Sequence, residues 1–366
     1  MTRYRFLRFL LFIILSLVIH PLRALLGGEP PQVTIKHRLA KVTGTSHPNA
    51  SAKFAPGLAR VADMQPRAPA PAGVVPPITP NSEFYVEDIH GPPKHLNAET
   101  WRLKISGNIG RPLTLSLDQI RKRPTLRQII TLSCIGNPVG GYALGNAEWQ
   151  GFSLSGLLDE ADPGFFAKTL VFKGEDGYHD SIPLGRARHP AALLAHTMNG
   201  EPLPREHGFP LRLLVPGLYG IKQVKWIREI EISNETHTGY WQKRNWSGKG
   251  KVKIISRIDF PKNDGWISAS KTVVRGIAFA GDRGIQYVQV STDGERSWSL
   301  ARLEKPLSPY SWVFWSFPMD LPRSGRYAVS VRAADQYSGI QRDGQRDAFP
   351  SGTSGIHRIQ FNVLFG

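Results

Sequence analysis

The sequence predicts an α+β domain over residues 81–249, followed by an all-β, immunoglobulin-like sandwich over residues 250–366. In the first region, apolar runs of strand length mix with short amphipathic stretches of helical spacing, without strict alternation. In the second region, about seven strand-length runs recur over roughly 110 residues, separated by Gly, Pro, Asp and Ser clusters, which is typical of a sandwich. A chain of 366 residues also exceeds one ordinary hydrophobic core.

The first 80 residues are predicted to lie outside both domains. Arg3, Arg5 and Arg8 precede an apolar run over residues 9–19, which is typical of a signal peptide or membrane anchor over residues 1–28. This predicts a periplasmic or membrane-associated protein, although neither a twin-arginine motif nor an A-x-A cleavage site is present. Residues 29–80 are rich in Pro and Ala and are expected to form an extended linker.

Composition excludes several classes. A hydrophobic content of 41% is a globular value, and a single cysteine excludes an intramolecular disulfide and a CxxCH haem attachment. The net charge is +17, but residues 1–80 carry ten Lys and Arg against two Asp and Glu, so about half of the excess lies outside the domains. With no basic run, helix-turn-helix pattern or zinc spacing, we expect no nucleic-acid partner.

Hydrophobic periodicity gives the expected elements of the first domain. Strands are predicted at 99–106, 127–133, 169–173, 211–215 and 224–232, and helices at 116–123, 151–160 and 189–198. The sandwich strands are predicted at 253–258, 272–280, 285–291, 298–303, 312–317, 325–333 and 357–364.

The only cysteine, Cys134, stands where the 127–133 strand ends and a loop rich in Gly and Pro begins. A thiol at such a junction is well placed to reach a ligand, because loops on a rigid scaffold carry chemistry. A lone cysteine is nevertheless more often a small apolar residue than a ligand, so its position alone leaves both roles open.

A second cluster lies further along the first domain. Gly217 and Gly220 permit close backbone approach, and Arg212 and Lys225 flank them with positive charge, which suits a phosphate cradle. The alternative is that the two cations are surface charges and the glycines only turn the chain. His207 by itself is equally compatible with a structural histidine.

These clusters lie in motifs that resemble the sulfite oxidase family of molybdopterin-binding oxidoreductases. The motifs are SCIGN (133–137), NAEWQG (146–151), MNGEPLPREHGFPLRLLVPGLYGIKQVKW (198–226) and YWQKR (240–244). The segments VSTDGERSW (290–298), VRAADQYSG (331–339) and GIHRIQFNV (355–363) are similar to that family's carboxy-terminal dimerisation domain. The resemblance covers residues 81–366 and implies a homodimer.

The resemblance implies a molybdenum–molybdopterin cofactor whose metal is bound by the Cys134 thiolate, soft sulfur being a reasonable ligand for this metal. Trp149 matches an aromatic residue that lines the substrate pocket, so the resemblance implies Cys134 and Trp149 as the catalytic residues. The implied cofactor-binding residues are Tyr85, Cys134, His207, Arg212, Gly217, Gly220 and Lys225.

The chain departs from the animal and plant sulfite oxidases at positions that recognise an anion. Glu87 stands in place of an arginine, Pro138 and Val139 replace a basic pair, and Trp246 replaces a tyrosine. Ile89 replaces a histidine, although His90 is adjacent. Because arginine suits oxyanion recognition, these changes predict a substrate other than plain sulfite.

The resemblance thus implies oxygen-atom transfer to or from a sulfur- or nitrogen-centred substrate, with electrons exchanged with a separate redox protein such as a cytochrome. Three alternatives remain at this stage. They are a reductase of oxidised sulfur compounds, a cofactor-free binding module on the same scaffold, and a hydrolase using Cys134 and His207, which lacks a nucleophile-elbow motif.

Overall fold

The computed structural model describes residues 73–365, so the predicted targeting segment and most of the linker lie outside the described residues. The last linker residues, 73–80, form neither helix nor strand. They are anchored all the same, because the Thr79 amide donates to the Asn146 carbonyl (2.7 Å) and the Asn146 side chain donates to the Pro77 carbonyl (2.7 Å). Within residues 73–365, no helix has the length and apolar character needed to cross a membrane.

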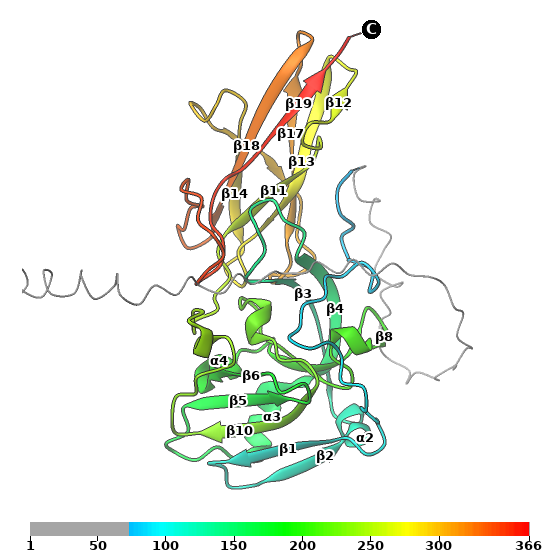
Figure 1. The fold of residues 1–366 in the computed structure, drawn as a ribbon, viewed down its shortest axis with the longest axis vertical. Coiled ribbons are helices and arrows are strands. Elements are labelled where there is room, and N and C mark those ends of the chain that lie inside the picture. The colour runs from blue at the N-terminus through cyan, green and yellow to red at the C-terminus, as the bar shows by residue number, and fades with distance from the viewer. Residues whose placement is uncertain (1–72, 366) are drawn as a thin grey trace, which may run out of the picture. The chain divides into compact units, whose positions relative to one another are not determined.

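The α+β prediction is wrong: the described chain consists mainly of β-strands (Figure 1). Its three α-helices are short: α2 (Leu117–Arg121), α3 (Leu154–Ala161) and α4 (Leu184–Ala187). The helix predicted at 189–198 is instead strand β7 (Leu193–Met198). Leu193 and Leu194 are both buried, and a strand buried on both faces cannot be told from a helix by periodicity.

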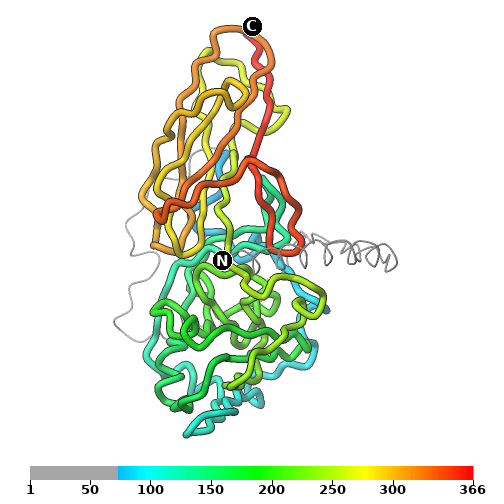
Figure 2. Tube along the Cα trace, turned by 90° about the vertical axis from the view of Figure 1, so that its left-hand side faces the viewer, coloured from blue at the N-terminus to red at the C-terminus, as the bar shows by residue number. Residues whose placement is uncertain are grey.

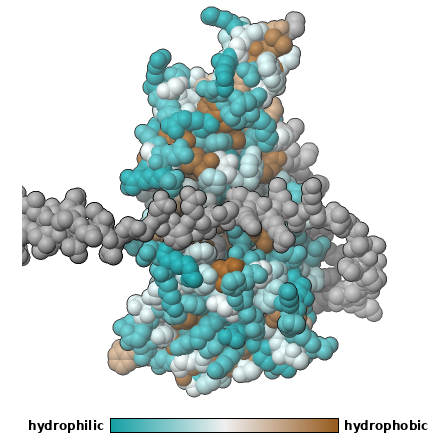
Figure 3. Space-filling view, viewed as in Figure 1, coloured by the Kyte–Doolittle hydropathy of each residue, from teal (hydrophilic) through white to brown (hydrophobic). Residues whose placement is uncertain are grey.

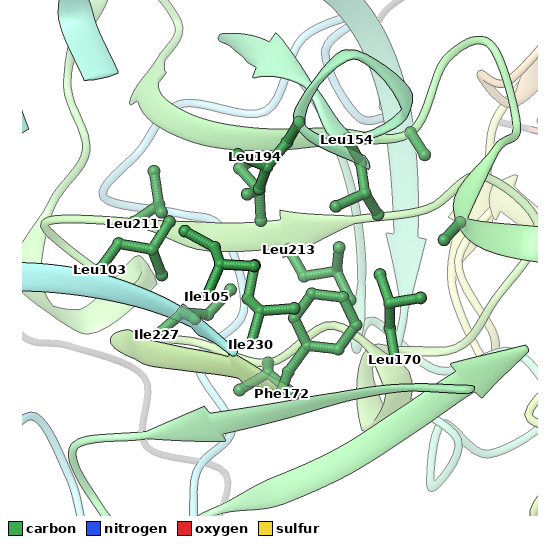
Figure 4. Close-up of a cluster of buried hydrophobic side chains, with 14 of the residues drawn as sticks. Leu103, Ile105, Leu154, Leu170, Phe172, Leu194, Leu211, Leu213, Ile227 and Ile230 are labelled. Atoms are coloured by element: carbon green, nitrogen blue, oxygen red, sulfur yellow. The ribbon is translucent and has the colours of Figure 1, made fainter. Parts of the chain in front are cut away.

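The first domain contains two sheets. One has the order β2 (Leu113–Ser116), β1 (Arg102–Gly107), β10 (Ile227–Ser233), β5 (Thr169–Gly174) and β6 (His179–Pro183). The other joins β3 (Thr125–Ser133), β4 (Leu144–Ser153), β7 and β8 (Glu201–Pro202), and β9 (Arg212–Leu214) pairs with β7. Figure 4 shows the apolar core between them, where Ile105, Phe172 and Ile230 meet Leu194 and Leu213.

Two helices expected in this domain are present. Helix α2 begins after Ser116, whose side chain caps it in a capping box with Gln119. Helix α3 begins three residues later than predicted, because β4 continues through Ser153, which then caps α3 by accepting from the Gly156 amide.

The second domain is compatible with the expected sandwich. One sheet has the order β11 (Ile255–Phe260), β13 (Lys271–Phe279), β17 (Val313–Asp320) and β16 (Arg302–Leu303). The other has the order β12 (Trp266–Ile267), β19 (His357–Val363), β18 (Gly325–Asp335), β14 (Ile285–Ser291) and β15 (Ser299–Leu300). The single strand expected at 298–303 is divided, because β15 and β16 join different sheets.

The sandwich also holds the strand and loop that carry Cys134. The Trp312 amide donates to the Thr131 hydroxyl (2.9 Å), and the Thr353 hydroxyl donates to the Asn137 carbonyl (2.6 Å). Arg257 donates from Nη1 to the Gly141 carbonyl (2.9 Å). Figure 2 shows the loop between β18 and β19, residues 336–356, reaching back to the first domain. The environment of Cys134 is therefore built by both domains.

Candidate cofactor site around Cys134

Cys134 follows β3 directly and has a half-buried side chain. Its amide donates to the Ala143 carbonyl (2.9 Å), and its sulfur accepts from the Gly136 amide (3.3 Å). Burial, followed by the negative charge of Glu87, raises the pKa of the thiol to about 12, so the thiol is protonated near neutral pH. A bound cationic metal would displace that proton, because a coordinating thiol is deprotonated.

Tyr85 and Gly220 meet at the same place. A Cβ on Gly220 would lie 3.1 Å from the Tyr85 hydroxyl, 3.6 Å from the Ser133 carbonyl oxygen and 4.0 Å from the Cys134 Cα. Tyr85 stacks on Phe84 with ring centroids 5.3 Å apart, and burial raises its pKa well above the ordinary value. The missing side chain of Gly220 leaves space between Tyr85 and the end of β3.

Arg212 lies on β9 with 5% of its surface exposed. Its Nη1 donates to the His207 carbonyl (2.9 Å), its guanidinium carbon lies 5.0 Å from the ring centroid of Trp149, and its Nε has no hydrogen-bond partner. Burial lowers the pKa of Arg212 to about 10. No carboxylate among the described residues forms an ion pair with it.

Lys225 lies beside Arg212, because both side chains border Gly208. A Cβ added at Gly208 would lie 3.2 Å from the Cβ of Lys225 and 3.0 Å from the Cβ of Arg212. Its Nζ donates to the Glu206 carbonyl (2.9 Å), and the nearest carboxylate oxygen, on Asp88, is 3.8 Å away. Burial, followed by repulsion from Arg212, lowers the pKa of Lys225 to about 8. Arg212 is buried and Lys225 nearly so, with 11% of its side chain exposed, and the charge of the two is only partly compensated, which favours an anionic ligand between them.

His207 is buried and neutral. Its Nε2 lies 3.0 Å from the Asn81 carbonyl oxygen, and its ring packs edge-on against Phe84 at 5.5 Å. Burial lowers its pKa to about 4. These contacts fix the segment that carries Tyr85. The His207 ring is directed to the Asn81 carbonyl, whereas the Cys134 sulfur accepts a hydrogen bond from the Gly136 amide. The pairing that a Cys134–His207 hydrolase requires is therefore not formed.

Two other predicted residues lie differently from the rest. Trp149 is fully buried, donates from Nε1 to the Ile130 carbonyl (3.2 Å), and touches the site through Arg212. Gly217 has a φ of +81° and packs toward the sandwich, where an added Cβ would lie 2.3 Å from the Asp282 carboxylate. The structure therefore brings Tyr85, Cys134, Arg212, Gly220 and Lys225 together, whereas the contacts described for Gly217 are with Asp282 and Arg186.

Sequence reasoning missed several residues around the thiol. Tyr178 and Tyr219 both have their pKa values raised by burial and, more weakly, by Cys134. The Tyr178 hydroxyl donates to the Ile221 carbonyl (2.6 Å), and that of Tyr219 accepts from the Lys253 amide (3.1 Å). Neither tyrosine stands out by spacing. The only signal was their position, with Tyr219 next to the Gly220 turn and Tyr178 after Gly177.

The residues present fit a cofactor that combines a thiophilic metal with an anionic group. The thiol needs a positive partner to ionise, and Arg212 and Lys225 need a negative one. Gly220 lies between Arg212 and Lys225 in the sequence, and the space beside it adjoins both Tyr85 and Cys134. The donor set is therefore complementary to such a group in charge and in ligand type.

Two protein families match the chain in succession. The family described as an oxidoreductase molybdopterin binding domain matches residues 90–241, and the Mo-co oxidoreductase dimerisation domain matches residues 249–347. The sulfite oxidase of Arabidopsis thaliana is 30% identical over 325 residues, covering 72% of this chain and 82% of its own. That of Gallus gallus is 31% identical over 317 residues, covering 73% and 68%.

The mitochondrial sulfite oxidase of Rattus norvegicus is 31% identical over 314 residues, and the chain spans 57% of its length. Among solved structures, the sulfane dehydrogenase SoxCD of Paracoccus pantotrophus shares the fold. Its TM-score is 0.69 at 24% identity, covering 79% of this chain and 84% of that one. The two matched families and the identity to complete sulfite oxidases place this chain in the sulfite oxidase family of molybdopterin-dependent oxidoreductases.

Proposed function

We propose that this protein is a molybdenum–molybdopterin oxidoreductase that transfers an oxygen atom to or from a sulfur- or nitrogen-centred substrate. The observation that supports it best is a half-buried thiol in the same domain as two partly compensated, buried cations. When bound, the cofactor would supply two-electron redox chemistry at its metal, and the protein would supply binding and orientation.

The roles of the side chains follow from their surroundings. Cys134 would be the protein ligand to the metal, because it follows β3 directly and its side chain is only half-buried. Arg212 and Lys225 would bind the anionic part of the pterin cofactor. Trp149 would hold the Arg212 guanidinium in place, and His207 would anchor the segment from which Tyr85 covers the site.

The substrate would not be plain sulfite. Glu87 places negative charge near Cys134, which disfavours a dianion at that position. Trp246 packs edge-on against Trp241 at 6.3 Å and presents an apolar ring where a sulfite oxidase has a tyrosine. Val139 lies in the loop after Cys134, and its side chain is beside Gly355 of the sandwich. A neutral substrate, such as an organic sulfoxide, sulfide or N-oxide, suits this environment better.

The assembly is also part of the proposal. The match of residues 249–347 to a dimerisation domain supports a homodimer. Two-electron chemistry needs a partner that accepts or supplies electrons, and a cytochrome is the natural class. The Arg-flanked apolar run within residues 1–28 supports export or membrane attachment, which cell fractionation of the full-length protein would test.

Steady-state assays of the purified full-length protein test the substrate. We expect turnover of a neutral sulfoxide with a reduced viologen, or of a sulfide with an oxidised acceptor, at a higher kcat/KM than sulfite. The direction that is faster separates an oxidase from a reductase. Efficient sulfite oxidation with a micromolar KM would show that the substrate assignment is wrong while leaving the cofactor assignment intact.

A further inference from the structure

A basic surface lies next to the candidate site. Residues 240–253 contain five Lys and Arg and no Asp or Glu: Lys243, Arg244, Lys249, Lys251 and Lys253. All but Lys253 are exposed, and none of the five forms an ion pair with another described residue. Unpaired cations of this density create a positive potential over the surface that surrounds them.

Aromatic side chains join this segment to the sandwich. Trp246 packs edge-on against Phe349 with centroids 5.4 Å apart, and the Ser247 amide donates to the Pro350 carbonyl (2.8 Å). Phe349 is 48% exposed although it is a large apolar residue. An exposed aromatic residue that packs against a segment rich in Lys and Arg has the composition expected at a protein–protein interface. We call residues 240–253 together with Phe349 the basic–aromatic surface.

This surface borders the same apolar cluster as the residue that follows Cys134. Trp241 and Trp246 pack on a cluster that includes Ile135, the residue after Cys134, and Tyr219. The loop that carries Phe349 also carries Thr353, whose hydroxyl donates to the Asn137 carbonyl (2.6 Å). Both the surface and the Cys134 loop are thus joined to the same apolar cluster and to the same loop of the sandwich, which places a redox partner bound here on the side of the molecule that carries the Cys134 loop.

We propose that the basic–aromatic surface is the docking site for an electron-transfer protein with an acidic face. The proposal rests on the function proposed above and adds the place and the charge of the partner. Charge complementarity selects an acidic protein, and it disfavours the chain's own residues 1–80, which are themselves basic. In Figure 3, the apolar residues that are visible on the face shown are scattered among hydrophilic ones.

The test uses the full-length protein, reduced with dithionite, and follows its reoxidation by an acidic cytochrome c in a stopped-flow instrument. The variant Lys243→Glu/Lys249→Glu should lower the second-order rate constant at low salt by roughly tenfold or more, and its salt dependence should become weaker. The matched control Lys122→Glu/Lys168→Glu changes the net charge equally on exposed residues beside α2 and β5, and it should change the rate less than about twofold.

The rate constant for reoxidation by a neutral benzoquinone should be the same in the parent and in both double Glu variants. With the cytochrome, Lys243→Gln/Lys249→Gln should lower the rate constant less than Lys243→Glu/Lys249→Glu does. Equal effects in both double Glu variants, or none in either, would overturn the docking site. Loss of binding to anionic phosphatidylserine vesicles, with unchanged cytochrome kinetics, would assign the surface to a membrane instead. Molybdenum is measured first: if it is absent, the proposed function fails and this inference fails with it.

Discussion

Two groups of buried cations in the first domain differ in how their charge is balanced. Lys222, in the 3₁₀ turn η3 (Gly220–Lys222), lies 2.7 Å from the Asp180 carboxylate, and the side chains of the pair are 5% and 1% exposed. It also donates to the Ser181 carbonyl (3.0 Å). Arg212 and Lys225 have instead a single ion pair between them, from Lys225 to Asp88 at 3.8 Å, with Asp176 and Glu87 acting on Lys225 from further away. The first group is complete within the protein, and the second is complete only with an anion.

The difference indicates which buried charges stabilise the fold and which await a ligand. A buried ion pair that is broken leaves an uncompensated charge, so its loss destabilises the protein. A buried cation without a counter-charge destabilises the folded state through its desolvation, so replacing it with an apolar residue should leave the free energy of unfolding unchanged or raise it. The two groups should therefore respond to mutation in opposite ways.

Replacing both partly compensated cations is expected to have the largest effect. The Arg212→Met/Lys225→Met variant should retain at least about a hundredfold less pterin, because each charge-assisted hydrogen bond to the cofactor contributes roughly 1.5–3 kcal/mol. Urea unfolding of the cofactor-free variant should show a free energy of unfolding equal to or above that of the cofactor-free parent. Pterin released on denaturation is measured by fluorescence. Full retention would show that the cofactor does not depend on these cations.

Lys222→Met should instead lower the stability of the cofactor-free protein by about 3–5 kcal/mol, because Asp180 is left buried and unpaired. The matched variant Lys222→Met/Asp180→Leu should recover most of the loss, since it removes both charges. Urea unfolding measures both. If the single substitution is neutral, Lys222 belongs with Arg212 and Lys225, and the comparison between the two groups is wrong.

The charge of Lys225 predicts how stability depends on pH. Its pKa in the folded protein, about 8, lies below that of an unfolded lysine, so unfolding takes up a proton between pH 8 and about 10.4. The cofactor-free protein should therefore gain stability over this range, on the order of 2 kcal/mol relative to Lys225→Met. A bound anion would raise the pKa again, so the loaded protein should lack this gain. Unfolding curves across the pH range, with and without cofactor, check both statements.

A substitution outside both groups of cations should have the smallest effect, and that effect should be on stability alone. Ser153→Ala removes the side-chain cap of α3 and should cost about 1 kcal/mol. Its molybdenum content per folded chain should stay at the parent value. A loss of metal in this variant would mean that cofactor retention follows general stability, which would remove the basis for assigning Arg212 and Lys225 a specific role.

The sequence allowed the local features of the site to be predicted, but not its surroundings. The strand that ends at Cys134 and the clustering of Arg212, Gly220 and Lys225 follow from short-range patterns, because these residues are near one another in the chain. The partners from the sandwich do not: Arg257 and Thr353 are 116 and 216 residues from the loop atoms they bind. Likewise Asp180 is 42 residues from Lys222, and no pattern links the two.

The errors have equally local causes. Leu193 and Leu194 gave a helical spacing in what is a doubly buried strand, and the two expected helices that do form are short, so the α+β assignment was wrong. Gly217 was grouped with the phosphate cradle because of its spacing, and its role there stays a prediction; its positive φ and its approach to Asp282 of the sandwich could not be read from that spacing. Spacing identifies where backbone can approach closely, and the tertiary structure decides what approaches.

The most direct test of the account is the molybdenum and pterin content of the full-length protein, purified from a host that makes molybdopterin. The account predicts about one molybdenum per chain, with pterin fluorescence after denaturation, and loss of both in Arg212→Met/Lys225→Met but not in Ser153→Ala. A well-folded protein with neither metal nor pterin would contradict it, and the buried cations would then have to bind a different anion on a scaffold that serves as a binding module.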